Sequence, residues 1–262
     1  MTQTTTPPAT PGPGQPARPD RSARPGRSRN RWPRRERWTL TGLLVLTAVP
    51  VIAGGARLGE LASDPAVTEA NARFVTMPAP VVVHIVTATV FSILGALQLM
   101  PAYRRNHLRR HRLTGRVVAP AGVLAALTGL WMTLWYDLPS ADDGPLTAVR
   151  LAAGTAMAAA LVLGVVAAVR RRIPQHRAWM IRGYALGLAA GTQVFTSLPL
   201  LATGAIPTDL TRTVSMTAGW VLNALVAEVV IGRGARPRKR PRHPGNREPD
   251  SHSRPGLPIL LS

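Results

Sequence analysis

The stretch RRRIPQHRAWMIRGY, Arg170–Tyr184, is a basic segment that runs directly into an apolar one. His176 and Arg177 lie where the two parts meet, and Arg182 lies about one turn inside the apolar part. Lysine and arginine are enriched in cytosolic loops, so a basic flank beside a long apolar run marks the cytosolic end of a membrane helix. The stretch therefore predicts a helix that enters a membrane from the inside.

A second basic stretch, RRNHLRRHRLTGR, covers Arg104–Arg116. It also leads into an apolar run, and it carries His111 followed by Arg112 and Arg116. We interpret both stretches as arginine-rich inner loops. Together they indicate a weak two-helix repeat, in which the second and third membrane helices correspond to the fourth and fifth.

Six apolar runs have the length that a membrane helix needs, which is about 20 residues. They predict an all-α, polytopic integral membrane bundle of six transmembrane helices in a domain covering residues 38–231. The first run also fits a cleaved secretory or twin-arginine signal, because Arg34 and Arg35 precede it. An uncleaved helix is preferred, since the run is long enough to span and more spans follow. The runs are Trp38–Ala56, Pro80–Met100, Gly115–Tyr136, Leu146–Val169, Ala178–Ala202 and Thr213–Ile231.

The charges are divided between the two sides of this layout. The formal net charge is +20, and all but four of the 32 lysines and arginines fall on the side that holds the two termini. The predicted outer segments hold only Arg57, Arg73, Arg150 and Arg212 of these. This asymmetry predicts an N-in, C-in plasma membrane protein with both termini cytoplasmic.

The two ends of the chain, residues 1–37 and 232–262, are basic and rich in proline and arginine. Segments with so few large apolar residues are expected to be disordered. We expect the basic loops and tails to attract anionic lipid headgroups. No nucleic acid partner is expected, since no recognition motif or aromatic interleaving accompanies the basic residues.

Few polar residues lie inside the apolar runs. His84, towards the outer side, and Gln98, near the inner side, are about four helical turns apart and share a face that should point into the bundle. Arg182 and Glu228 lie at matching depth near the inner side, so we expect a direct or water-bridged pair in an inner polar pocket. The predicted functional polar cluster comprises Gln98, Arg116, Arg177, Arg182, Asn223 and Glu228.

Three histidines, His84, His111 and His176, are candidate ligands of a b-type haem. His111 and His176 begin their helices at the membrane interface, where histidine also caps helices or contacts headgroups. The chain has no cysteine, which excludes thiolate metal sites and disulfides. No catalytic residue and no metal site is predicted, because no nucleophile set, paired carboxylates or metal-ligand cluster is present.

The succession GALQLMPAYRR, HRLTGR, HRAWMIRGYAL and WVLNALVAE resembles the bacterial membrane proteins of the family DUF2306, a domain of unknown function, over about residues 84–231. The resemblance implies the architecture and a set of motif positions, and it brings no activity. Three functions stay open: a redox protein that binds haem or quinone, a small-molecule or proton-coupled transporter, and a non-catalytic structural or regulatory protein. The motif positions are His84, Gln98, His111, Arg116, His176, Arg177, Arg182, Asn223 and Glu228.

Overall fold

A computed structural model describes residues 32–138, 144–204 and 208–235, and within them the chain forms nine α-helices and no strand. The all-α prediction is therefore confirmed. The helices are α1 (Arg34–Ala62), α2 (Ala72–Thr76), α3 (Pro78–Leu99), α4 (Pro101–Asn106), α5 (Leu108–Trp135), α6 (Pro145–Val169), α7 (Ile173–Gly187), α8 (Ala189–Ala202) and α9 (Asp209–Ala235).

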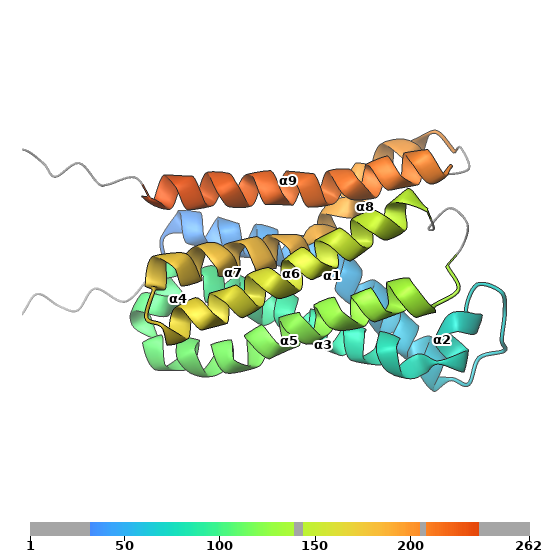
Figure 1. Ribbon diagram of the computed structural model, residues 1–262, viewed down its shortest axis with the longest axis horizontal. Coiled ribbons are helices and arrows are strands. Elements are labelled where there is room, and N and C mark those ends of the chain that lie inside the picture. The colour runs from blue at the N-terminus through green and yellow to red at the C-terminus, as the bar shows by residue number, and fades with distance from the viewer. Residues whose placement is uncertain (1–31, 139–143, 205–207, 236–262) are drawn as a thin grey trace, which may run out of the picture.

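The long helices lie roughly side by side in one elongated bundle (Figure 1). Two helical hairpins form its centre: α3 packs on α5, α6 packs on α7, and α5 joins the two hairpins by packing on α6. Helix α9 lies along α6, α7 and α8, whereas α1 lies against α3 and α8. The paired hairpins correspond to the two halves of the weak repeat that the sequence predicts.

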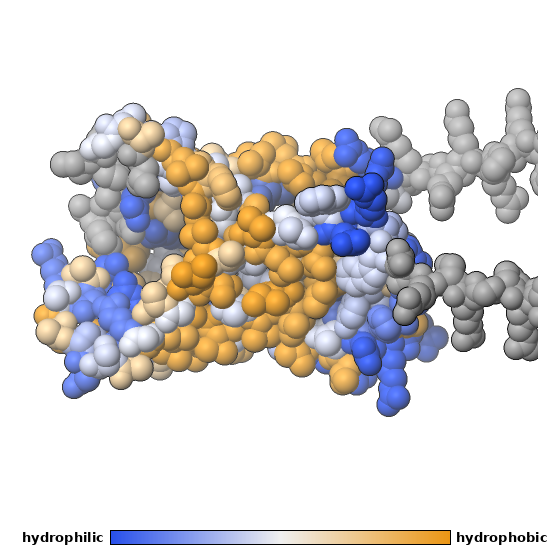
Figure 2. Space-filling model, turned by 180° about the vertical axis from the view of Figure 1, so that it is seen from behind, coloured by the Kyte–Doolittle hydropathy of each residue, from blue (hydrophilic) through white to orange (hydrophobic). Residues whose placement is uncertain are grey.

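Five helices of the described residues are long and apolar enough to cross a membrane: α1, α3, α5, α6 and α9. On the face of the molecule that Figure 2 shows, apolar residues form a broad band along the middle of the bundle, with polar residues gathered at its two ends. An apolar surface of this size is expected where lipid, not water, surrounds the protein. The chain is thus a membrane protein with several candidate spans.

The fifth predicted run, Ala178–Ala202, is divided between two helices and is not among the five candidate spans, so the predicted sixth span is not confirmed. Helix α7 ends at Gly187 and α8 begins at Ala189. At the junction the Gly191 N–H donates to the carbonyl of Leu188 at 3.0 Å, three residues back, in place of the usual four. A tightened turn flanked by two glycines is a recognised cause of a break in a helix.

We call the end of the bundle that carries the arginine-rich segments its inner end. At this end several helices are longer than predicted. Helix α1 starts at Arg34, inside the segment expected to be disordered, and the expected loop around His111 belongs to α4 and α5. Glu36 joins the start of α1 to α4: one carboxylate oxygen accepts the Ala102 backbone N–H at 2.6 Å, and the other accepts from Arg105 at 3.3 Å. Helix α9 likewise extends past the predicted end, to Ala235, and the remaining tail residues lie outside the described ranges.

Glycines bring the central helices close together. A Cβ atom on Gly95 would lie 2.6 Å from the ring of Tyr184, and one on Gly183 would lie 2.7 Å from Leu161. Tyr184 is buried and donates its hydroxyl hydrogen to the Ser92 carbonyl at 2.9 Å. Gly183 belongs to a stripe of glycines at every fourth position, a pattern typical of close helix packing.

Aromatic residues gather at the opposite end of the bundle, and such belts are typical of membrane–water interfaces. Trp131 stacks on Trp135 and meets Tyr136 edge-on, both at 5.6 Å between ring centroids. Tyr136 in turn meets Phe74 edge-on, and its hydroxyl donates to the Met77 carbonyl at 2.7 Å. These contacts fix the short helix α2 against α3 and α5.

Candidate functional site

Arg182 and Glu228 form the ion pair that the sequence predicts. The Arg182 Nε and Nη2 atoms donate to the two carboxylate oxygens at 2.6 and 2.9 Å, which joins α7 to α9. The guanidinium also lies over the ring of Trp179, 4.9 Å from its centroid. The Glu228 side chain is 54% exposed and that of Arg182 is 34% exposed. The pair therefore lies on the flank of the bundle, with both side chains partly exposed.

Two other members of the predicted polar cluster join neighbouring helices. Gln98 donates its amide N–H to the His111 carbonyl at 3.2 Å and also to the Thr114 hydroxyl. Asn223 donates to the Ala185 carbonyl at 3.0 Å and accepts from the Thr192 hydroxyl at 2.9 Å. The Asn223 contacts connect α9 to both α7 and α8, across their junction. Both residues thus satisfy buried backbone groups and fix the helix packing.

The other two arginines of the predicted cluster lie apart from this pair. Arg116 is exposed and lines a surface groove along α5 with other residues of that helix. The Arg177 guanidinium packs against Gly234 near the end of α9, where a cation is favourable because the carbonyl ends of a helix carry partial negative charge. The structure therefore separates the predicted cluster into several small sites.

The inner end carries more positive charge than its acids balance. Burial, and then the charges of Arg177 and Arg105, lower the pKa of Arg104, while Glu36 acts in the opposite direction. Glu36 already accepts hydrogen bonds from the start of α4. An anionic group close to Arg104 would therefore be stabilised by electrostatic attraction.

The three candidate haem histidines do not form one site. His111 and His176 lie at the inner end and interact electrostatically, and the Nδ1 atom of His176 bonds to the Gly164 carbonyl at 2.8 Å. The Nδ1 atom of His111 is enclosed without a hydrogen-bond partner among the described residues. His84 lies in the first half of α3, far along the bundle from these two. No group of three or more histidines and acids that could hold a metal ion occurs in the described residues.

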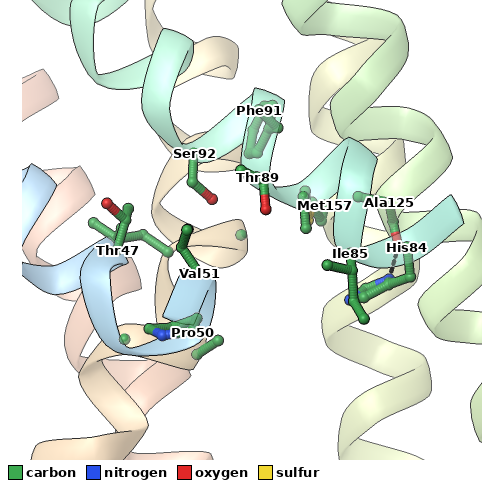
Figure 3. Close-up of a pocket in the computed structure, with 15 residues that line it drawn as sticks. Thr47, Pro50, Val51, His84, Ile85, Thr89, Phe91, Ser92, Ala125 and Met157 are labelled. Carbon is green, nitrogen blue, oxygen red and sulfur yellow. Dashed lines mark hydrogen bonds between the residues drawn. The ribbon is translucent and has the colours of Figure 1, made fainter. Parts of the chain in front are cut away.

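His84 lines a cavity of about 160 Å³ between α1, α3, α5, α6 and the α7–α8 junction (Figure 3). The cavity runs from the surface of the bundle into its core. Its deep wall contains the buried residues Phe91, Met157 and Leu188, whereas Ala190 is exposed. The lining residues are Thr47, Pro50, Val51, His84, Ile85, Ala88, Thr89, Phe91, Ser92, Ala125, Met157, Gly187, Leu188, Ala190 and Gly191.

The imidazole of His84 is held in one orientation. Its Nδ1 atom lies 2.9 Å from the Ala125 carbonyl oxygen and 3.2 Å from the Thr128 hydroxyl oxygen. A carbonyl oxygen only accepts hydrogen bonds, and the Thr128 hydroxyl is directed at the carbonyl of Leu124, at 2.8 Å. The Nδ1 atom therefore carries the hydrogen. In the neutral ring, Nε2 then keeps a lone pair, and this edge of the ring faces the cavity (Figure 3).

Sequence reasoning found His84 but missed the cavity itself. Two of its walls come from α1 and the α7–α8 junction, where the lining has one polar side chain, the buried Thr47, and a lone threonine in an apolar run does not mark a site. Gly187 and Gly191 were the available signal, because glycine removes side-chain volume at a position that lines the cavity. Their regular spacing is equally typical of helix packing, and both also make close contacts, with Phe91 and with the backbone of Leu46.

Comparison with known proteins gives a family for this chain. The family model DUF2306, described as a predicted membrane protein, matches residues 81–231, which contain most of α3, all of α4 to α8 and most of α9. No curated protein and no solved structure matches the chain. The match covers more than half of the sequence and agrees with the resemblance seen in its motifs. The chain belongs to the DUF2306 family of membrane proteins.

Proposed function

We propose that this membrane protein binds the ring of a small lipid-soluble molecule in the cavity beside His84. The observation that carries the proposal is a fixed imidazole directed into an otherwise mostly apolar cavity within the candidate spans. Binding sites for small molecules commonly combine an apolar lining with a few placed polar groups. The cavity opens beside the exposed Ala190, and a ligand dissolved in lipid can enter by this opening.

The size of the cavity selects between the two redox ligands considered from the sequence. Its volume is about 160 Å³, close to the roughly 150 Å³ of an engineered cavity that holds benzene. One six-membered ring therefore fits, whereas a porphyrin, built from four linked rings, is too large. Of haem and quinone, the quinone class is the one that this cavity supports.

The membrane layout is part of the same proposal. Helices α7 and α8 together cover residues 173–202, which is long enough for a sixth crossing. With six crossings, the arginine-rich end of the bundle is cytosolic, both termini are cytosolic, and the protein lies in the plasma membrane with anionic headgroups around Arg104 and its neighbours. Reporter fusions after Ala62 should signal the outside, and fusions after Asn106 and Arg171 the inside. An outside signal after Asn106 contradicts this layout.

A transporter is the second candidate, because the α7–α8 break at Leu188 lines the same cavity. Interrupted helices at a binding site are frequent in transporters, which usually contain two of them. The described residues contain one, so transport ranks below binding. Uptake of a bound probe into proteoliposomes, compared with empty vesicles, distinguishes the two functions.

The test uses 4-fluoroanisole, a single-ring probe, and fluorine NMR of the probe with detergent-purified protein. The variant Ala88→Leu places extra methyl groups in the cavity. Its matched control, Ala159→Leu, makes the same change at an exposed position on α6. We expect binding to the natural protein and to Ala159→Leu, and at least a several-fold loss in Ala88→Leu. Equal binding by all three proteins would show that the probe only enters the micelle, and the proposal would fail.

A further inference from the structure

We infer that the ligand of the His84 cavity carries a ring hydroxyl, as a phenol or a quinol does, and that this hydroxyl donates its hydrogen to the Nε2 atom of His84. This inference rests on the proposed function and names the chemical class of its ligand. It follows from the geometry of one side chain, the volume around it and the hydroxyl groups at the other end of the cavity.

The first step is the direction of the hydrogen bond. The Nδ1–H group of His84 is used by the Ala125 carbonyl and the Thr128 hydroxyl, both of which act as acceptors towards it. A charged imidazole at this depth is costly, and no carboxylate contacts His84 among the described residues. The ring is therefore neutral and presents an acceptor to the cavity. An acceptor selects a ligand with a hydrogen to donate and disfavours a bare carbonyl or ether.

The second step is the shape of the ligand. The volume matches a single six-membered ring, and the buried ring of Phe91 forms part of the wall. A ring hydroxyl meets both requirements, because it brings one donor on an apolar body. A lipid tail attached to the ring would leave the cavity beside Ala190, which is exposed.

The third step concerns the far end of the cavity. The hydroxyl groups of Thr89 and Ser92 point into it (Figure 3), and neither has a hydrogen-bond partner within the described residues. Ser92 lies eight residues after His84 on α3, about 12 Å along the helix axis. A ring with oxygen atoms at opposite ends, as in a quinol, can therefore meet His84 with one oxygen and a serine or threonine hydroxyl with the other.

The experiment compares two probes of the same ring, 4-fluorophenol, which donates a hydrogen bond, and 4-fluoroanisole, which does not. Binding is measured by fluorine NMR with the natural protein, His84→Asn and Ser92→Ala. Asparagine can still place an N–H near the Ala125 carbonyl, but it is too short to present an acceptor to the cavity. One additional hydrogen bond predicts about a three- to ten-fold preference for the phenol, after correction for partition into detergent.

We expect His84→Asn to bind 4-fluoroanisole as the natural protein does and to lose the preference for the phenol, while Ser92→Ala keeps most of it. Equal affinity of the two probes for the natural protein overturns the inference but leaves the proposed function intact. Failure of both probes to bind the natural protein overturns the proposed function itself. If His84→Asn loses both probes because the cavity has collapsed, the preference measured in the natural protein decides the inference alone.

Discussion

The Arg182–Glu228 pair provides a quantitative test of how a charge pair behaves on the flank of this bundle. Replacing either residue by leucine leaves the other charge without its two hydrogen bonds, which are 2.6 and 2.9 Å long. Replacing both removes the unpaired charge altogether. The stability losses of the two single variants should therefore add up to more than the loss of the double variant.

The expected magnitude follows from the depth and the exposure of the pair. An unpaired charge at the centre of a membrane helix costs about 2.5–3.5 kcal/mol by insertion scales. Glu228 lies only three residues before Ile231, where the predicted apolar run ends, which is about 4–5 Å along the helix axis. The partial exposure of both side chains also lets them turn towards headgroups and water. We therefore expect each single variant to lose about 1–2 kcal/mol, less than the midplane value.

The assay is thermal unfolding of the purified protein in a mild detergent. For a chain of this size, 1 kcal/mol corresponds to about 2–4 °C in Tm, so each single variant should melt about 2–8 °C lower. The double variant should lose no more than the worse single variant. Arg116→Leu, at an exposed position on α5, is the control, and its effect should add to that of Glu228→Leu. Fully additive losses for Arg182→Leu and Glu228→Leu would refute the reasoning.

Three further predictions test other parts of the structure. The purified protein should show no Soret band, because the His84 cavity fits a single ring; a Soret band that disappears in His111→Ala or His176→Ala would instead establish haem at the inner end. Asn223→Leu should lower Tm by about 2–4 °C, since it removes two hydrogen bonds worth about 1 kcal/mol in total; an unchanged Tm would contradict a role in joining α9 to α7 and α8. Gly95→Ala should lower Tm by more than that, because overpacking a close contact costs about 1–3 kcal/mol, and a stabilised variant would contradict the packing.

The parts of the fold that the sequence predicts are those set by one-dimensional patterns. Apolar runs identify the helices, since each run must cover the membrane core with residues that need no water. Periodicity places His84 and Gln98 on one face, and both do contact α5. Depth alone pairs Arg182 with Glu228, because each lies about one turn inside its predicted apolar run on the same side.

The parts that the sequence misses depend on contacts between distant segments. The early start of α1 depends on Glu36 meeting α4, 66 residues away, and no local pattern encodes that meeting. The exposure of the Arg182–Glu228 pair depends on how α7 and α9 are rotated against their neighbours. Matching depth specifies that two charges can meet, but it does not specify whether they meet inside the bundle or on its flank.

The break at Leu188 involves both a pattern along the sequence and contacts between distant helices. Glycines at positions 183, 187 and 191 form a regular stripe, which predicts one helix with one close neighbour. In the structure the three glycines face different partners: Leu161 of α6, Phe91 of α3 and the backbone of α1. The helix is interrupted at Leu188, between Gly187, which meets α3, and Gly191, which meets α1. These three residues also line the cavity beside His84, so positions that serve helix packing form one wall of the candidate binding site.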